Sequence, residues 1–294
     1  MKATDQSEWR LPLARRVAGP YYQDPGVSAV GVTGSVARGW ADRYSDIELL
    51  VLWSDAPSEW QRETVARRAG AGHLRLYPQD SLGTDEWSED FLVHGVKFDV
   101  LHLTIQTLDQ LIHDVVGCYD TSLAKQHVLS SLQYVIALAG ADILGERRMA
   151  IARYPDGLAE AMVQEYLRFG PQSWVEMLAD RGEIVGLHDI YVHASRTIVT
   201  LLLALNRVYH PGFKWLDRTI EDLSLQPSHL TPRLHELFQG EPREGVRELR
   251  KLIGETFSLV ETTMPGIDTR PARERFEQTR SVWDSAPASL FEGT

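Results

Sequence analysis

Hydrophobic residues in the first third of the chain fall into short runs separated by glycine, proline and polar residues. The runs cover residues 27–33, 46–53, 73–78 and 96–103. Each run is short and bounded by turn residues, and the first is rich in β-branched side chains, which is typical of buried strands. Between the second and third runs a helix is predicted to begin near Ser58 and to end before Gly70. Strands that alternate with helical pieces predict an α/β layer.

A strongly acidic segment lies between the third and fourth runs. Residues 79–90, QDSLGTDEWSED, contain five acidic residues and no Lys or Arg. We predict a loop here, and a solvated turn is its ordinary interpretation. The alternative is that the segment lines a substrate pocket and attracts a cationic ligand.

The hydrophobic pattern changes after Thr104. From there onward the residues predict helices that are broken by glycine and proline. The clearest helix covers residues 183–209, with apolar residues at helical spacing along its second half. We therefore predict an α/β domain with a mixed sheet and flanking helices over residues 1–115, and an all-α helical bundle over residues 116–294.

Composition narrows the class of protein. The 294 residues are 43% hydrophobic and 24% charged, as expected for a soluble globular chain of two domains. Cys118 is the only cysteine, so neither a disulfide network nor a zinc-site spacing is present, and a cytoplasmic location fits. Residues 1–16 lack the apolar core of a signal peptide. The longest apolar run, Ile198–Leu205, is far shorter than the roughly 20 residues that span a bilayer, so no membrane partner is expected.

The net charge of −11 bears on the partners. Proteins that hold nucleic acid by its phosphates normally present a basic face, so nucleic acid is not expected as a general partner. The charge is compatible with small, neutral or cationic partners, and equally with simple solubility. The sequence predicts no oligomeric state.

Two carboxylates stand at the start of the second strand. Asp46 and Glu48 are two residues apart, so in a strand both side chains project from the same face. Adjacent carboxylates repel each other unless a cation lies between them. Mg²⁺ prefers oxygen ligands and is commonly held by one or two carboxylates together with substrate phosphates. Asp99 lies within the later strand, where aspartate is disfavoured, and the three acids would converge if the two strands are neighbours. Three carboxylates can hold two metal ions.

A tight turn precedes the carboxylates. Gly34 permits a sharp bend, Ser35 can cap the short helix that follows, and the free N–H groups of such a turn can bind an anion. A triphosphate on this turn would bring its metal ions to the acids. The pattern therefore predicts a metal platform for a nucleotide.

The stretch GSVARGWADRYSDIELLVL, residues 34–52, resembles the nucleotidyltransferase superfamily with the DNA polymerase beta-like fold. The shared elements are Gly34-Ser35, the acid-x-acid pair after about ten residues, and Asp99 on a later strand. The second acid is a departure, since Asp is commoner there than Glu48. The C-terminal half is similar to the bacterial branch that includes kanamycin nucleotidyltransferase and the streptomycin adenylyltransferases. That branch has a lysine after a long helix, which Lys214 matches.

The resemblance implies a reaction and a role for each residue. A nucleoside triphosphate, ATP as the expected donor, would bind between the domains with two Mg²⁺ ions, and the helical domain would close the cleft. Asp46 and Glu48 would hold the metals, and Asp99 would be the general base or a third metal ligand. Gly34, Ser35, Arg38 and Lys214 would contact the nucleotide.

Each assignment has a structural alternative. The acid pair can be a solvated strand end, and Asp99 can pair with Lys97 on the same face. Ser35 can act only as a helix cap. Arg38 and Lys214 can face solvent.

Three functions follow. The first is transfer of a nucleoside monophosphate, AMP from ATP, to a hydroxyl of a small molecule such as an aminoglycoside-like antibiotic, with release of pyrophosphate. The second is the same transfer to a protein side chain or to tRNA, as in toxin-like relatives, although the acidic balance weighs against tRNA. The third is a non-catalytic nucleotide-binding protein, against which the intact acids argue.

Overall fold

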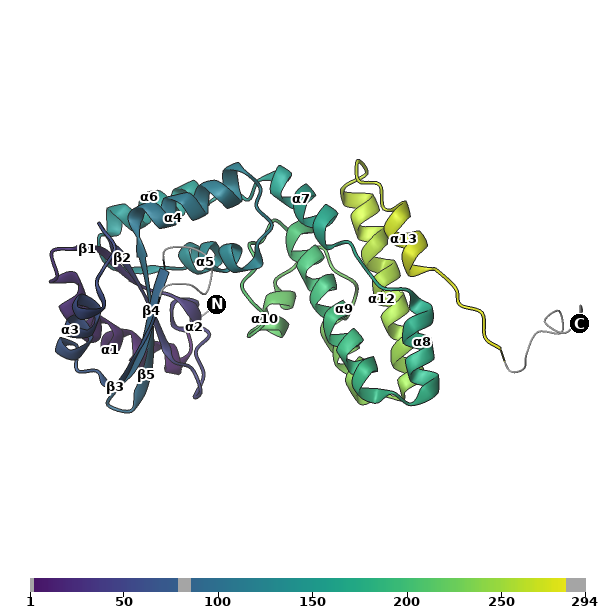
Figure 1. Ribbon diagram of the computed structural model, residues 1–294, viewed down its shortest axis with the longest axis horizontal. Coiled ribbons are helices and arrows are strands. Elements are labelled where there is room, and N and C mark those ends of the chain that lie inside the picture. Colours follow the sequence, from purple (N-terminus) through teal and green to yellow (C-terminus); the bar gives the residue numbers. More distant parts are fainter. Residues whose placement is uncertain (1–2, 79–85, 284–294) are drawn as a thin grey trace, which may run out of the picture. The chain divides into compact units, whose positions relative to one another are not determined.

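Six strands form one mixed sheet in the N-terminal part of the computed structural model, which describes residues 3–78 and 86–283 (Figure 1). The strand order is β3-β4-β5-β2-β1-β6, and β2 pairs in parallel with β5 while the other neighbours are antiparallel. The strands are β1 (Val27–Val32), β2 (Ile47–Trp53), β3 (Gly72–Tyr77), β4 (Glu86–Val93), β5 (Val96–Thr104) and β6 (Ile136–Ala139).

The chain divides into two compact units. The first consists of residues 1–158 and 208–212, and the second of residues 159–207 and 213–294. The helices of the first unit are α1 (Asp5–Tyr22), α2 (Gly34–Ala37), α3 (Glu59–Arg68), α4 (Ile105–Ile112) with a π-helical turn (His113–Gly117), α5 (Leu123–Gln133) and α6 (Ala141–Ala150). Helix α7 (Asp156–Tyr166) begins in the first unit and continues into the second. The predicted fold class, an α/β unit followed by an all-α region, is confirmed.

The hydrophobic core lies on one face of the sheet, under α1 and α3. Alternate strand residues such as Leu49 and Val51 point into it and are almost fully buried, because the strand period of two places them on the same face. Helix α1 contributes Ala14, Val17 and Tyr21, which recur at helical spacing. Helix α3 begins at a capping box formed by Ser58 and Gln61, in agreement with the predicted helix start.

Residues beyond 115 complete the sheet. Strand β6 pairs with β1 at its edge, and helix α6 packs against β1 through Leu144, which approaches Gly31. The prediction of helices alone after Thr104 is therefore wrong for residues 136–139. The first unit extends to residue 158 and not only to about 115, because these elements pack on the sheet.

The acidic segment contains a strand. Residues 79–85 lie outside the described residues, but Glu86–Val93 form β4, between β3 and β5. The predicted loop is wrong there, because the acids are paired in the fold. Glu89 is fully buried, accepts a hydrogen bond of 2.5 Å from the Tyr21 hydroxyl, and lies 3.3 Å from Nε2 of His102.

The second unit contains the rest of the helices. They are α8 (Gln172–Arg181), α9 (Ile184–Leu205), α10 (Leu216–Glu221), α11 (Leu230–Gln239), α12 (Pro242–Thr263) and α13 (Arg270–Phe276). Helix α9 is the predicted long helix, but it ends before residue 209, since Arg207 adopts a left-handed φ of 58°. No helix within residues 3–78 and 86–283 has both the length and the apolar character needed to cross a membrane.

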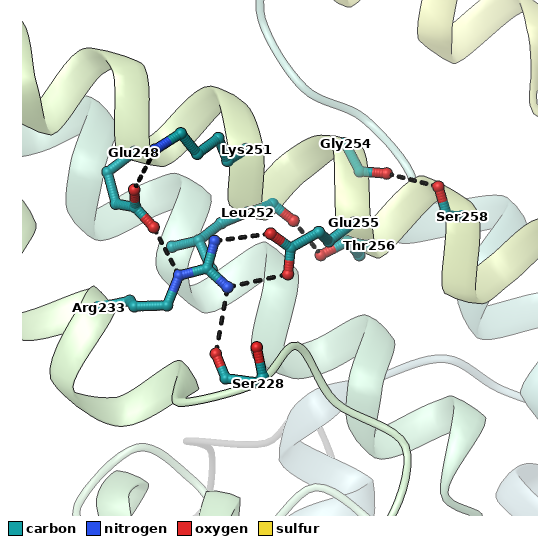
Figure 2. A network of polar contacts seen from close by, with 9 residues as sticks. All are labelled: Ser228, Arg233, Glu248, Lys251, Leu252, Gly254, Glu255, Thr256 and Ser258. Carbon is teal, nitrogen blue, oxygen red and sulfur yellow. Dashed lines mark hydrogen bonds and ion pairs between the residues drawn. The ribbon is translucent and has the colours of Figure 1, made fainter.

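An ionic network joins α11 to α12 in the second unit, as Figure 2 shows. The Arg233 guanidinium donates to both carboxylate oxygens of Glu255, at 2.7 and 2.8 Å, to Glu248, and to the Ser228 carbonyl. The Arg233 and Glu248 side chains are largely buried. Such paired, charge-assisted bonds are stronger than neutral ones and fix the relative orientation of the two helices.

Arg233→Met is expected to lower the free energy of unfolding by about 2 kcal/mol, because it leaves two partly buried carboxylates without their donor. Chemical denaturation followed by circular dichroism measures the change. The matched control is Lys251→Met, whose exposed ion pair with Glu248 is expected to contribute less than about 1 kcal/mol. Equal effects of the two substitutions would contradict a stabilising role for the Arg233 network.

Candidate functional site

A row of charged side chains crosses the face of the sheet opposite α1 and α3. Glu48 on β2 pairs in register with Asp99 on β5, Asp99 with Asp90 on β4, and Asp90 with Arg75 on β3. Register partners share a face of the sheet, about 4.8 Å from strand to strand. The strand that carries Asp99 is thus the neighbour of the strand that carries Glu48, which was the condition for the three predicted acids to lie together.

Asp46 is positioned by a buried arginine of α1. Arg10 is 4% exposed, and its Nε donates to the Ser45 carbonyl at 3.0 Å, one residue before Asp46. The Ser45 hydroxyl in turn donates to Asp42 at 3.0 Å. These bonds fix the backbone just ahead of β2. Arg10 was missed from the sequence, where its place among apolar residues of a helix was the available signal.

Lys97 lies among the acids. Its Nζ contacts both oxygens of Asp99, at 2.5 and 2.8 Å, and lies 3.9 Å from Oδ2 of Asp46. Burial raises the pKa of Asp99, the neighbouring Asp46 carboxylate raises it further, and Lys97 opposes both effects. The pairing of Asp99 with Lys97, one of the two sequence interpretations, is present.

The Gly34-Ser35 turn is in contact with Glu48. Gly34 has a φ of 61°, and a Cβ added to it would lie 1.2 Å from Oε2 of Glu48. The carboxylate therefore lies against the turn at which a phosphate was expected. The predicted cap is wrong, because Thr33 is the N-cap of α2 and Ser35 is a buried residue of its first turn.

Arg38 is held by α5 and does not face solvent freely. Its guanidinium donates to the Ser130 hydroxyl at 2.7 Å and carbonyl at 3.1 Å, and lies 4.0 Å above the Tyr134 ring. These contacts tie the end of α2 to α5.

A pocket of about 290 Å³ lies between the acidic face of the sheet and α5. Glu48, Asp90 and Asp99 contribute to its wall from the sheet, and His127 from α5. Burial alone would raise the pKa of Asp90, but hydrogen bonds from Arg75 and Tyr77 outweigh it and lower that pKa. Within the described part of the chain, neither Lys nor Arg lines this pocket.

Residues 208–212 form a strap that packs against α5 and the connection between α6 and α7 within the first unit. The His210 amide donates to Gln126, the Gly212 amide donates to Nδ1 of His210 at 3.1 Å, and Tyr209 stacks on Tyr154. Burial, and to a smaller extent the nearby His127, lower the pKa of His210 to about 4. His127 is itself kept neutral by burial, which lowers its pKa.

The strap predicts a loss of stability in acid. The pKa of His210 is about 4 when folded and about 6.5 when unfolded, so its contribution is fully present above pH 6.5 and is lost as the pH falls towards 4. Between pH 7.5 and 5.0 the free energy of unfolding is expected to fall by about 2 kcal/mol because of this histidine. In His210→Gln that part of the pH dependence is expected to disappear. Denaturation at the two pH values measures it. His193→Gln, at an exposed position of α9, serves as control and keeps the wild-type slope. An unchanged slope in His210→Gln would refute the assignment.

The donor set suits Mg²⁺, because Asp46, Glu48 and Asp99 offer only carboxylate oxygens on one face. Two of these carboxylates already contact other groups, since Asp99 is bound to Lys97 and Glu48 lies against Gly34. Among residues 3–78 and 86–283, no group of three or more Asp, Glu, His or Cys side chains is assembled as a metal site. Metal binding would therefore have to reorient at least one of these carboxylates.

Lys214 belongs to the second unit and is an exposed residue of the connection between α9 and α10. Its proposed contact with nucleotide phosphates stays a prediction.

A family model matches part of the chain, and a solved structure is similar to it. Residues 121–216, which are 96 of the 294, match a family model described as a domain of unknown function (DUF4037). The match begins before α5 and ends after the strap, and it leaves out Asp46, Glu48 and Asp99. No curated protein matches the chain. The crystal structure of a nucleotidyltransferase-like protein from Exiguobacterium sibiricum is similar with a TM-score of 0.35 and 12% identity, over 87% of this chain and 80% of that one.

Proposed function

We propose that the chain transfers a nucleoside monophosphate, AMP from ATP, to a hydroxyl group of a small molecule and releases pyrophosphate. The observation that carries this proposal is the pairing of Glu48 with Asp99 on one sheet face, beside the Gly34 turn and in the wall of a pocket, with Asp46 just ahead of β2. Phosphoryl chemistry depends on positioning and on stabilisation of negative charge, and such a platform can provide both.

The proposed step is an in-line displacement. The acceptor oxygen forms a bond to the α-phosphorus, the bond from that phosphorus to the bridging oxygen of the β-phosphate breaks, and pyrophosphate leaves. The hydroxyl proton passes to a carboxylate, for which Asp99 is the candidate, since its raised pKa makes it a better base than an ordinary aspartate.

Asp46 and Glu48, with Asp99, are the residues that would hold Mg²⁺. When bound, Mg²⁺ supplies neutralisation of the triphosphate charge. The chain's own contribution is to hold Asp46 through Arg10 and Ser45, and to limit water access to Asp99 by partial burial.

The pocket favours a cationic acceptor. Its wall includes Glu48, Asp90 and Asp99, while the described residues bring no Lys or Arg to that wall. A ligand that carries both ammonium and hydroxyl groups, such as an aminoglycoside, would meet complementary charge.

The experiment is incubation with ATP labelled at its α-phosphate, Mg²⁺, and separate panels of aminoglycosides, other hydroxylated antibiotics, tRNA and cell protein. Label on a small cationic molecule is the expected result. Label only on protein or tRNA would replace the acceptor class by the toxin-like alternative. ATP binding without transfer to any panel would overturn the proposal in favour of a nucleotide-binding protein.

A further inference from the structure

Four charged groups form a two-by-two array at the open end of β2 and β5. Asp46 lies one residue before β2 and Glu48 lies within it, while Lys97 and Asp99 are two residues apart on β5 and share a face. The parallel register places Glu48 beside Asp99, and Lys97 lies next to Asp46. The array therefore carries three negative charges and one positive charge.

The positive charge lies between two of the acids. Nζ of Lys97 contacts both oxygens of Asp99 within 2.8 Å and lies 3.9 Å from Oδ2 of Asp46. A cation that bridged Asp46 and Asp99 would occupy this same region. The ammonium is held there by its contacts with Asp99, which stands two residues along β5, although the Lys97 side chain is 43% exposed.

The charge balance decides how many further cations the array takes. Three carboxylates and one ammonium leave the array itself a charge of −2, which one divalent ion neutralises, and the nearby charges of Arg10 at Asp46 and Arg38 at Glu48 reduce it further. A second divalent ion would have to displace the ammonium from Asp99 while the lysine stayed within a few ångströms. At such distances the two positive charges repel each other, which opposes binding of the second ion.

We propose that the Lys97 ammonium takes the place of one of the two metal ions, so that the chain binds a single divalent cation, through Asp46 and Glu48. This proposal rests on the metal platform of the proposed function and specifies it. Lys97 is then a resident counter-ion of Asp99, and the second divalent site expected from the resemblance is absent from this chain.

The experiment counts bound Mn²⁺ by the loss of the free-ion signal in electron paramagnetic resonance, without nucleotide or acceptor. Wild type and Lys97→Arg, which keeps the charge, are expected to bind one ion per chain. Lys97→Met, which keeps the length and removes the charge, is expected to bind two. Asp46→Asn is expected to lose the single wild-type ion, and thermal melts check that every variant is folded.

The outcomes separate this inference from the proposed function. Two ions on the wild type, equal counts on wild type and Lys97→Met, or no binding by either protein would overturn the inference. A chain that binds one Mn²⁺, gains a second in Lys97→Met, and yet transfers no label to any acceptor would leave the inference intact and refute nucleotidyl transfer.

Discussion

Asp46→Asn is expected to lower the rate of nucleotidyl transfer by about a thousandfold or more and to leave the fold intact. The substitution keeps the size of the side chain and removes its negative charge, at the point where the proposed site would hold Mg²⁺ and the triphosphate. The side chain is 17% exposed and lies at the open end of the sheet face, so little packing is lost. Initial rates with the labelled nucleotide, together with a denaturation curve, measure both effects.

Asp55→Asn is the matched control for this change. Asp55 is exposed and lies just beyond the opposite end of β2 from Asp46. Asp55→Asn is therefore the same chemical change at a position away from Asp46, Glu48 and Asp99. Its rate is expected to stay within twofold of wild type. Wild-type turnover in Asp46→Asn would show that Asp46, Glu48 and Asp99 are not the catalytic site, whatever the acceptor.

Gly34→Ala is expected to reduce transfer at least about a hundredfold and to destabilise the first unit by several kcal/mol. The backbone at Gly34 has a φ of 61°, and the new methyl group would lie 1.2 Å from Oε2 of Glu48. Either the turn or Glu48 must move, and both belong to the proposed site. A left-handed backbone alone costs a non-glycine residue about 1 kcal/mol of stability. A larger loss of stability in Gly34→Ala would therefore come from the clash between the new methyl group and Glu48.

Gly70→Ala separates these two contributions. Gly70 also has a positive φ, of 91°, but a Cβ there meets nothing within 4 Å. It therefore carries the backbone cost without the collision, and its transfer rate is expected to be unchanged. Adding Glu48→Ala to Gly34→Ala is expected to recover much of the stability but none of the activity. If Gly34→Ala is no worse than Gly70→Ala on either measure, the close contact with Glu48 has no consequence.

The central strands could be predicted from sequence because local and tertiary preferences agree there. Strands β1, β2 and β5 are apolar runs with clear turn residues, and the predicted bounds differ from the observed ones by at most one residue. The acids at 46, 48 and 99 were recognisable for the opposite reason, since charged residues at the ends or inside of apolar strands require an explanation.

Strand β4 was missed because its acids are stabilised by residues distant in sequence. Glu89 is partnered by Tyr21, which is 68 residues away, and Asp90 by Arg75. No local pattern reveals such pairs, so a polar stretch was interpreted as a loop. Strand β6 has only four residues, and so short an apolar run does not distinguish a strand from a helix.

The contacts that the site residues make with one another also depend on tertiary structure and could not be predicted from the sequence. That Lys97 contacts Asp46 follows from the parallel pairing of β2 with β5, and that Glu48 lies against Gly34 follows from the path of the turn. The sequence identified the residue types that carry the chemistry, and the fold determines which of them are already paired.

The strap at residues 208–212 has a consequence for synthesis on the ribosome. Domains generally fold in the order in which they emerge. Here the last piece of the first unit is made only after residues 159–207, which belong to the other unit, have left the exit tunnel. Until Gly212 emerges, Gln126 and Tyr154 lack their native contacts, and a nascent chain stalled earlier would present an incomplete surface to chaperones and proteases.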